Sequence, residues 1–177
     1  MLYITVILAL LALSREPLTS AEMKDLSENQ VKAAYLFNFA KYVEWPASAF
    51  SDPGAPLVIG IIGKSPFGEA IDSLAGRTAK GRKVQVRQSS RMDKLGGIQM
   101  LFIASSEKPR LREILGAVHN SSVVTVSDIK GFCDLGGMIG LMTRGEKVQF
   151  EVNIGNAERA GLKISSQMLK LAVSVRD

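Results

Sequence analysis

Histidine and cysteine are almost missing from this sequence, which has one residue of each type in 177. A single cysteine cannot close a disulfide bond within the chain. One histidine and one cysteine also fall short of the ligand set of a usual zinc site. We therefore expect no metal site, with Cys133 as a small buried core residue and His119 at the end of a helix.

Complete catalytic and nucleotide-binding motifs are also lacking. The segment 63–65 ends like a phosphate-binding loop, but the glycine that this motif requires five residues upstream is replaced by Val58. The same segment fails as a nucleophile elbow, because Phe67 occupies the position of the second glycine. We expect a protein that is not an enzyme and holds no cofactor.

The charge is basic, with a formal net value of +5, and seven Lys or Arg residues against one acid fall in the segment 77–94. A basic stretch of this kind can bind nucleic acid. It lacks interleaved aromatic residues, however, and an exported protein would not meet nucleic acid. We interpret it as a solvated strand and turn and expect no nucleic-acid partner.

The N-terminus carries a twelve-residue, largely apolar run at 2–13. As a helix it would rise about 18 Å, which is too short to cross a bilayer core of about 30 Å. Small residues at 19–21 suit cleavage, although no Lys or Arg precedes the run. We predict a signal peptide over 1–21 and a single domain over 22–177. An uncleaved anchor or a cytoplasmic helix is the alternative.

Aromatic residues are few, and five of the eleven fall between Val31 and Pro46. Ser27 and Gln30 form a capping-box pattern, and Pro46 disfavours helical angles in the residue before it, so we predict a helix between these points. The expected inward face comprises Val31, Tyr35, Leu36, Phe39, Tyr42 and Val43.

The rest of the chain alternates strand and helix patterns and then changes. Short apolar or alternating runs predict strands, and capped amphipathic runs predict helices. The predicted fold class is α/β, with a mixed sheet that has a parallel βαβ part, a C-terminal antiparallel hairpin, and helices on both faces. The predicted strands are 56–63, 82–88, 100–105, 121–128, 136–143 and 146–155, and the predicted helices are 65–76, 108–119, 156–161 and 165–175.

Polar residues follow three of the predicted parallel strands. Ligands of open α/β sheets bind beyond the carboxyl ends of such strands, so a small-ligand crevice is one possibility here. Helix capping by the serines is the other. The candidate crevice residues are Lys64, Ser65, Ser105, Ser127 and Asp128.

Phe37 stands apart from the other aromatic residues of the first helix. On a helical wheel it falls with Asn38, Lys41 and Glu44, away from the apolar face. Aromatic residues are favoured anchors at interfaces. We hypothesise a partner-binding face made by Phe37, Lys41 and Trp45. The alternative is that Phe37 packs under a loop or the termini.

Four blocks carry a resemblance to a known family: "KAAYLFNFAKYVEWP", "IGIIGKSPFGEAIDSLAGR", "GFCDLGGMIGLM" and "VQFEVNIGNAERAGLKISSQMLKLA". In this order they resemble the YfiR family over about 28–173. The resemblance implies a periplasmic homodimer that binds the periplasmic region of a membrane-anchored diguanylate cyclase and represses it, which lowers cyclic-di-GMP and biofilm formation. It also implies release by an outer-membrane, peptidoglycan-binding lipoprotein.

Two points qualify this resemblance. Some family members carry paired cysteines near the "GG" block, whereas Cys133 stands alone here, so we expect no redox sensing by an internal disulfide. The alternative function is a periplasmic sensor or carrier of a small ligand, which would bind in the strand-end crevice.

We predict cleavage close to Ala21 and an exported product. Mass spectrometry of the mature protein, purified from a periplasmic extract, should find a chain that begins near residue 22. Recovery of the protein from the cytoplasmic fraction with Met1 intact would refute the export prediction.

Overall fold

The computed structural model describes residues 27–177, so the predicted signal peptide lies outside the described residues. Helix α1 (Glu28–Tyr42) begins at the predicted capping box. The Ser27 backbone amide donates to Gln30 Oε1 over 2.8 Å, and the Gln30 amide donates to Ser27 Oγ over 3.3 Å. Within 27–177 no helix has the length and apolar character needed to cross a membrane.

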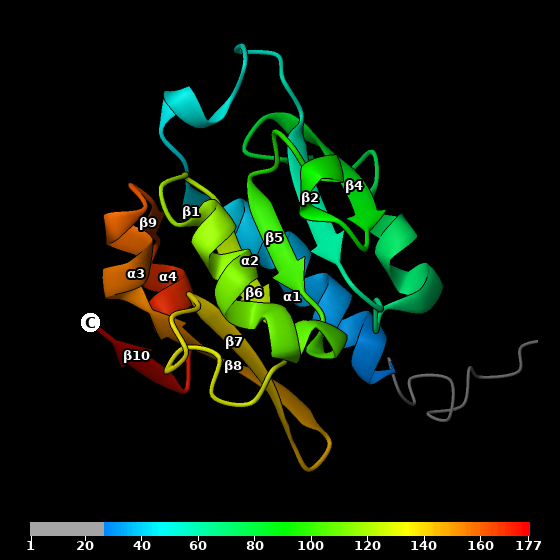
Figure 1. The fold of residues 1–177 in the computed structure, drawn as a ribbon, viewed down its shortest axis with the longest axis vertical. Coiled ribbons are helices and arrows are strands. Elements are labelled where there is room, and N and C mark those ends of the chain that lie inside the picture. The colour runs from blue at the N-terminus through cyan, green and yellow to red at the C-terminus, as the bar shows by residue number, and fades with distance from the viewer. Residues whose placement is uncertain (1–26) are drawn as a thin grey trace, which may run out of the picture.

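One mixed sheet of eight strands runs through the molecule in the order β10-β8-β7-β6-β5-β2-β4-β3 (Figure 1). The five strands from β4 to β7 in this order are mutually parallel, β8 is antiparallel to β7, β10 is parallel to β8, and β3 is antiparallel to β4. The predicted fold class is therefore confirmed. The strands are β2 (Leu57–Ile62), β3 (Thr78–Ala79), β4 (Arg82–Ser89), β5 (Met100–Ile103), β6 (Val124–Ser127), β7 (Ile139–Arg144), β8 (Lys147–Asn153) and β10 (Ser174–Arg176).

The central strands are apolar on both sides because helices cover both faces of the sheet. In β2, Ile59 and Ile61 join the core under α1, whereas Val58 and Ile62 join the core under α2 (Leu111–Val118). This double burial explains why β2 reads as a continuous apolar run instead of an alternating one. Short 3₁₀ segments complete the connections: η2 (Ala47–Ala49), η3 (Gly68–Leu74), η4 (Met92–Lys94) and η5 (Ser105–Arg110).

The helix predicted over 65–76 is a 3₁₀ segment, η3, that begins later than expected. Gly68 has a φ of +53°, in the left-handed region that interrupts an α-helix. Ser65 accepts a hydrogen bond from the Phe67 amide over 3.3 Å, which is a local turn and not the expected cap of a helix.

The helix predicted over 165–175 is present only in its first turn. After α3 (Ile154–Arg159) and β9 (Lys163–Ile164), helix α4 (Ser166–Leu169) ends early and the chain enters β10. Leu171 and Val175, two apolar residues of this segment, are 72% and 45% exposed. The chain pairs with the edge of β8 instead. The Val173 amide donates to Phe150 O over 2.9 Å, and Arg176 forms an ion pair with the buried Glu151 over 2.7 Å.

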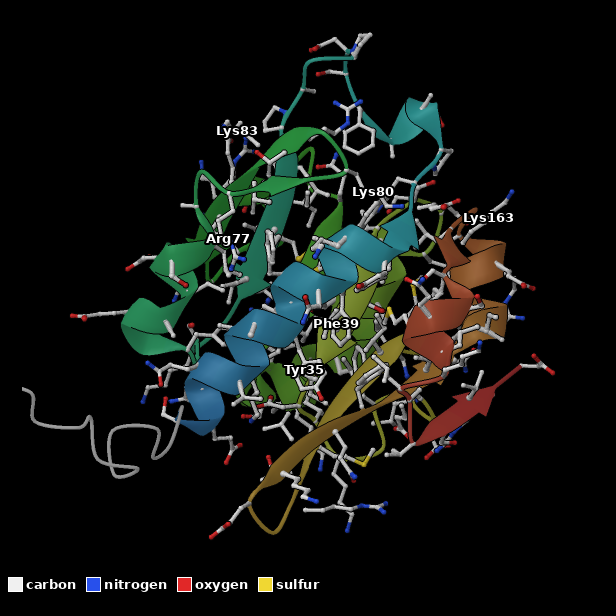
Figure 2. All side chains as sticks on the ribbon, turned by 180° about the vertical axis from the view of Figure 1, so that it is seen from behind. Tyr35, Phe39, Arg77, Lys80, Lys83 and Lys163 are labelled. Atoms are coloured by element: carbon white, nitrogen blue, oxygen red, sulfur yellow. The ribbon has the colours of Figure 1, made fainter. Side chains whose placement is uncertain are left out.

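Aromatic packing joins α1 to the C-terminal hairpin β7–β8. The Phe39 and Phe150 ring centroids lie 5.1 Å apart, and the Tyr35 and Phe150 centroids lie 5.5 Å apart, both in edge-on contacts. The Tyr35 hydroxyl, at the exposed end of this contact, donates to Val148 O over 3.2 Å. Figure 2 shows Tyr35 and Phe39 on α1 over the sheet. This packing explains the aromatic residues at positions 35 and 39 of α1.

A buried lysine ties the first half of α1 to two distant segments. Lys32 Nζ lies 2.7 Å from Glu28 Oε1 and 3.0 Å from Asp128 Oδ2, and Glu28 also accepts from Thr143 over 2.8 Å. Burial alone would lower the pKa of Lys32, but the hydrogen bonds to Glu28 and Asp128 outweigh it and raise the pKa. Lys32 is therefore charged and fixes α1 to the end of β6 and to the β7–β8 hairpin.

Cys133 is a buried core residue, as predicted, with 2% of its surface exposed. Burial, with a smaller contribution from the nearby Glu151 carboxylate, raises the pKa of the thiol to about 12. At pH 8 the thiol is protonated, and a protonated thiol is a poor nucleophile.

We therefore predict that Ellman's reagent does not label the folded protein at pH 8 and labels one thiol per chain after unfolding in guanidinium. Reductant should leave the melting temperature unchanged. Rapid labelling of the folded chain would contradict the buried position of Cys133.

Candidate interaction surface around helix α1

Phe37 is buried, so its predicted exposure is wrong. Its side chain is 7% exposed, and the guanidinium carbon of Arg77 lies 3.6 Å from the centroid of its ring. Arg77 directly precedes β3, and the β3–β4 hairpin folds over this side of α1. A helical wheel describes one helix and carries no information about a hairpin that covers its polar side.

Lys41 and Trp45 keep part of the predicted surface. Lys41 is exposed, with its Nζ 5.7 Å from the centroid of the Tyr42 ring. Trp45 is partly exposed, and its indole N–H donates to Gln99 O over 2.9 Å. The polar group of Trp45 is thus used within the fold, and Lys41 is the freely presented member of the predicted set.

Exposed basic residues lie on the C-terminal half of α1, on the β3–β4 hairpin and on β9. We name this set the α1 basic surface: Lys41, Arg77, Lys80, Lys83 and Lys163. All five are exposed. In Figure 2, Lys80 lies at the upper end of α1, Arg77 and Lys83 lie to its left over the β3–β4 hairpin, and Lys163 lies to its right.

Glu44 is a carboxylate inside this surface. Its strand β1 (Val43–Glu44) pairs with β9, and this register places Glu44 opposite Lys163. Lys80 Nζ lies 3.6 Å from Glu44 Oε1. Both members of that ion pair are well exposed, so it adds little stability. One carboxylate among five cations leaves the α1 basic surface with an excess of positive charge, which suits an acidic protein surface.

The backbone of Lys80 is held in an unusual conformation. Lys80 and Gly81 form the two-residue turn of the β3–β4 hairpin, with φ values of +51° and +76°. Turns of this type favour asparagine or glycine at both positions. A non-glycine residue in the left-handed region costs about 1–2 kcal/mol. The turn presents a lysine at the top of the α1 basic surface in spite of this cost.

Of the five residues of the α1 basic surface, only Lys41 was predicted from the sequence as part of a binding face. The density of Lys and Arg in the segment 77–94 was the available signal for Arg77, Lys80 and Lys83. The position of this segment beside α1 depends on the tertiary fold, which the local sequence does not show. Lys163 has no local signal, because only the pairing of β1 with β9 brings it next to Glu44.

The predicted strand-end crevice is only partly present. β2, β5 and β6 do end at one edge, where the Lys64 amide donates to Ser106 Oγ over 2.9 Å. Lys64 and Ser105 are exposed, and Ser65 is partly exposed. Ser127 is fully buried, and its hydroxyl donates to Ile103 O and accepts from the Ile129 amide. Ser127 therefore has a structural role, and its burial contradicts the predicted position in an open crevice.

Asp128 lines a hollow of about 430 Å³ together with Lys130, Asp134, Arg144 and Glu151. One of its oxygens is bound to Lys32, and the other, Oδ1, is buried without a hydrogen-bond partner among the described residues. Three carboxylates and two cations face this hollow. Its mixed charge indicates no preference for an anionic or a cationic ligand.

A family model for YfiR/HmsC-like proteins matches residues 29–173 of the chain. The chain belongs to the YfiR/HmsC-like family. The match covers all of the described secondary structure apart from Glu28 and β10, and it confirms the resemblance read from the four sequence blocks. The family is regulatory and non-catalytic, and it is associated with diguanylate cyclase signalling.

We predict that Phe37→Ala lowers the free energy of unfolding by about 3–5 kcal/mol, the usual loss for a buried phenylalanine. The exposed neighbour Asn38 provides the control, and Asn38→Ala should stay within about 0.5 kcal/mol of the parent protein. Urea denaturation measures both. Equal stability of the two variants would show that Phe37 is not buried in solution.

Proposed function

We propose that this protein is a periplasmic repressor that binds the periplasmic region of a membrane-anchored diguanylate cyclase. Binding holds the cyclase inactive and so lowers cyclic-di-GMP and biofilm formation. The observation that carries the proposal is the match to the YfiR/HmsC-like family over residues 29–173. Signal-peptide cleavage and assembly as a homodimer are parts of the same proposal.

The α1 basic surface is the proposed docking site for the cyclase. It presents five exposed cations, it lies on an α1 that Lys32 fixes to the sheet, and it includes a lysine held at an unfavourable φ. Backbone strain of this kind is often kept at functional positions. The complementary partner is an acidic face on the periplasmic part of the cyclase.

Repression requires that the protein bind one conformation of the cyclase more tightly than another. Such a preference shifts the population of the cyclase toward its inactive conformation, and the shift is limited by the difference in affinity. An outer-membrane, peptidoglycan-binding lipoprotein would relieve repression by competing for the repressor. No step of this mechanism involves bond chemistry in the repressor itself.

We predict that deleting the gene raises cyclic-di-GMP and surface attachment in a strain that has a membrane cyclase gene nearby. Wild-type protein should restore the low level. A variant with Lys41→Glu, Lys80→Glu and Lys163→Glu should not restore it, because it reverses the charge of the proposed docking site.

The matched control carries Lys94→Glu, Lys108→Glu and Lys147→Glu, which change the net charge equally at exposed lysines outside the α1 basic surface. Affinity capture from solubilised membranes measures cyclase binding directly, and circular dichroism checks that both variants fold. Full repression by the α1 variant would exclude this docking site. Unchanged cyclic-di-GMP after deletion would favour the small-ligand sensor instead.

A further inference from the structure

A hollow of about 620 Å³ lies between α2, α3 and the segment that leads into β6. We name it the α2–α3 pocket. It contains none of the residues of the α1 basic surface or of the predicted strand-end crevice. Its volume falls within the range of about 300–1,000 Å³ that is typical of small-molecule sites.

Helix α2 forms one wall of the pocket through residues spaced by a helical turn. Arg112, Leu115 and His119 recur on one side of the helix, at intervals of three and four residues. Leu111 and Ile114 face the core instead. The packing of α2 on the sheet therefore fixes the direction in which the pocket-facing residues point.

Helix α3 forms the opposite wall and holds an arginine in a defined position. Asn156 Nδ2 donates to Gly136 O over 3.1 Å, while Asn156 Oδ1 accepts from the Arg159 guanidinium. The Asn156 backbone N–H in turn donates to Oδ1 of the cap residue Asn153 over 2.8 Å. Arg159 is thus oriented by a side chain that is itself hydrogen-bonded to the backbone of Gly136.

The lining of the pocket is both cationic and apolar. Arg112, His119 and Arg159 line it. Among the described residues that line the pocket, there is no Asp or Glu. The apolar part is made by Leu115, Leu135, Met138 and neighbouring small residues, and Leu135 is 52% exposed. An isolated exposed leucine is ordinary, but a leucine beside a cationic hollow suits a ligand with an apolar body and a negative end.

We propose that the α2–α3 pocket binds a small amphipathic monocarboxylate. Its carboxylate lies at Arg159 and Arg112, since guanidinium groups match carboxylates in a two-point geometry. Its aliphatic body contacts Leu115, Leu135 and Met138. Inorganic anions would leave the apolar wall unused. Nucleotides are disfavoured because the lining has no Phe, Tyr or Trp on which a base could stack.

Isothermal titration calorimetry of the full mature chain, with octanoate as the probe, tests this proposal. Octanoate should bind, and 1-octanol and acetate should each bind at least tenfold more weakly, because each lacks one of the two features. Arg112→Gln combined with Arg159→Gln should weaken octanoate binding at least tenfold. Arg91→Gln combined with Arg144→Gln removes the same charge at exposed positions outside the pocket and should leave binding unchanged.

A second variant tests the pocket without changing its charge. Gly116 lines the pocket, and a Cβ at this position would meet no atom within 4 Å, so Gly116→Leu should fill the hollow while it preserves α2. It should abolish octanoate binding and keep the melting temperature. Absence of octanoate binding to the parent protein would overturn the proposal, as would equal binding of 1-octanol or acetate. Unaltered binding by the double variant or by Gly116→Leu would also overturn it.

Discussion

The position of α1 depends on the ion pairs of the buried Lys32 ammonium group. This group bridges Glu28 on its own helix and Asp128 at the end of β6, and Glu28 reaches Thr143 on the β7–β8 hairpin. A buried pair of this kind contributes little net stability compared with apolar packing, but removal of one partner leaves an uncompensated charge and costs about 3–5 kcal/mol. Its effect is to specify one position for α1. That position allows Phe39 to pack on Phe150 and carries Lys41 to the edge of the β3–β4 hairpin.

Local signals were sufficient for most of the fold. Ser27 and Gln30 located the start of α1, and the apolar runs placed the central strands, because each rule concerns residues close together in the sequence. The end of α1 was predicted too late, because Val43 and Glu44 leave the helix after Tyr42 and pair with β9 before Pro46 is reached. The segment 165–175 failed for the opposite reason. Its apolar residues fit a helical period, but the free edge of β8 offered hydrogen bonds to Val173, and the buried Glu151 offered an ion pair to Arg176. Pairing with the edge of a sheet is a tertiary effect, and it cannot be predicted from helical periodicity.

The candidate site was harder to predict than the fold, for the same physical reason. The wheel placed Phe37 on the polar side of α1 correctly, yet that side is covered by Arg77. The basic segment 77–94 was visible as a charge cluster, but its relation to Lys41 and Lys163 arises from the β3–β4 turn and from the β1–β9 pair. Ser127 was chosen for its position at a strand end. Its burial and its two internal hydrogen bonds could not be read from that position.

The segment from α3 to β9 connects the two proposed binding regions. Arg159 lines the α2–α3 pocket, and four residues later Lys163 belongs to the α1 basic surface. Between them, Leu162 is buried in the core beneath α1, and Ile164 pairs with Val43 at the end of that helix. Proximity along the chain does not itself produce coupling. A ligand at Arg159 changes the affinity of the basic surface only if α3 and β9 have two arrangements that the ligand binds unequally. If they have one, both sites act independently, and the affinity for octanoate will be the same with and without the cyclase.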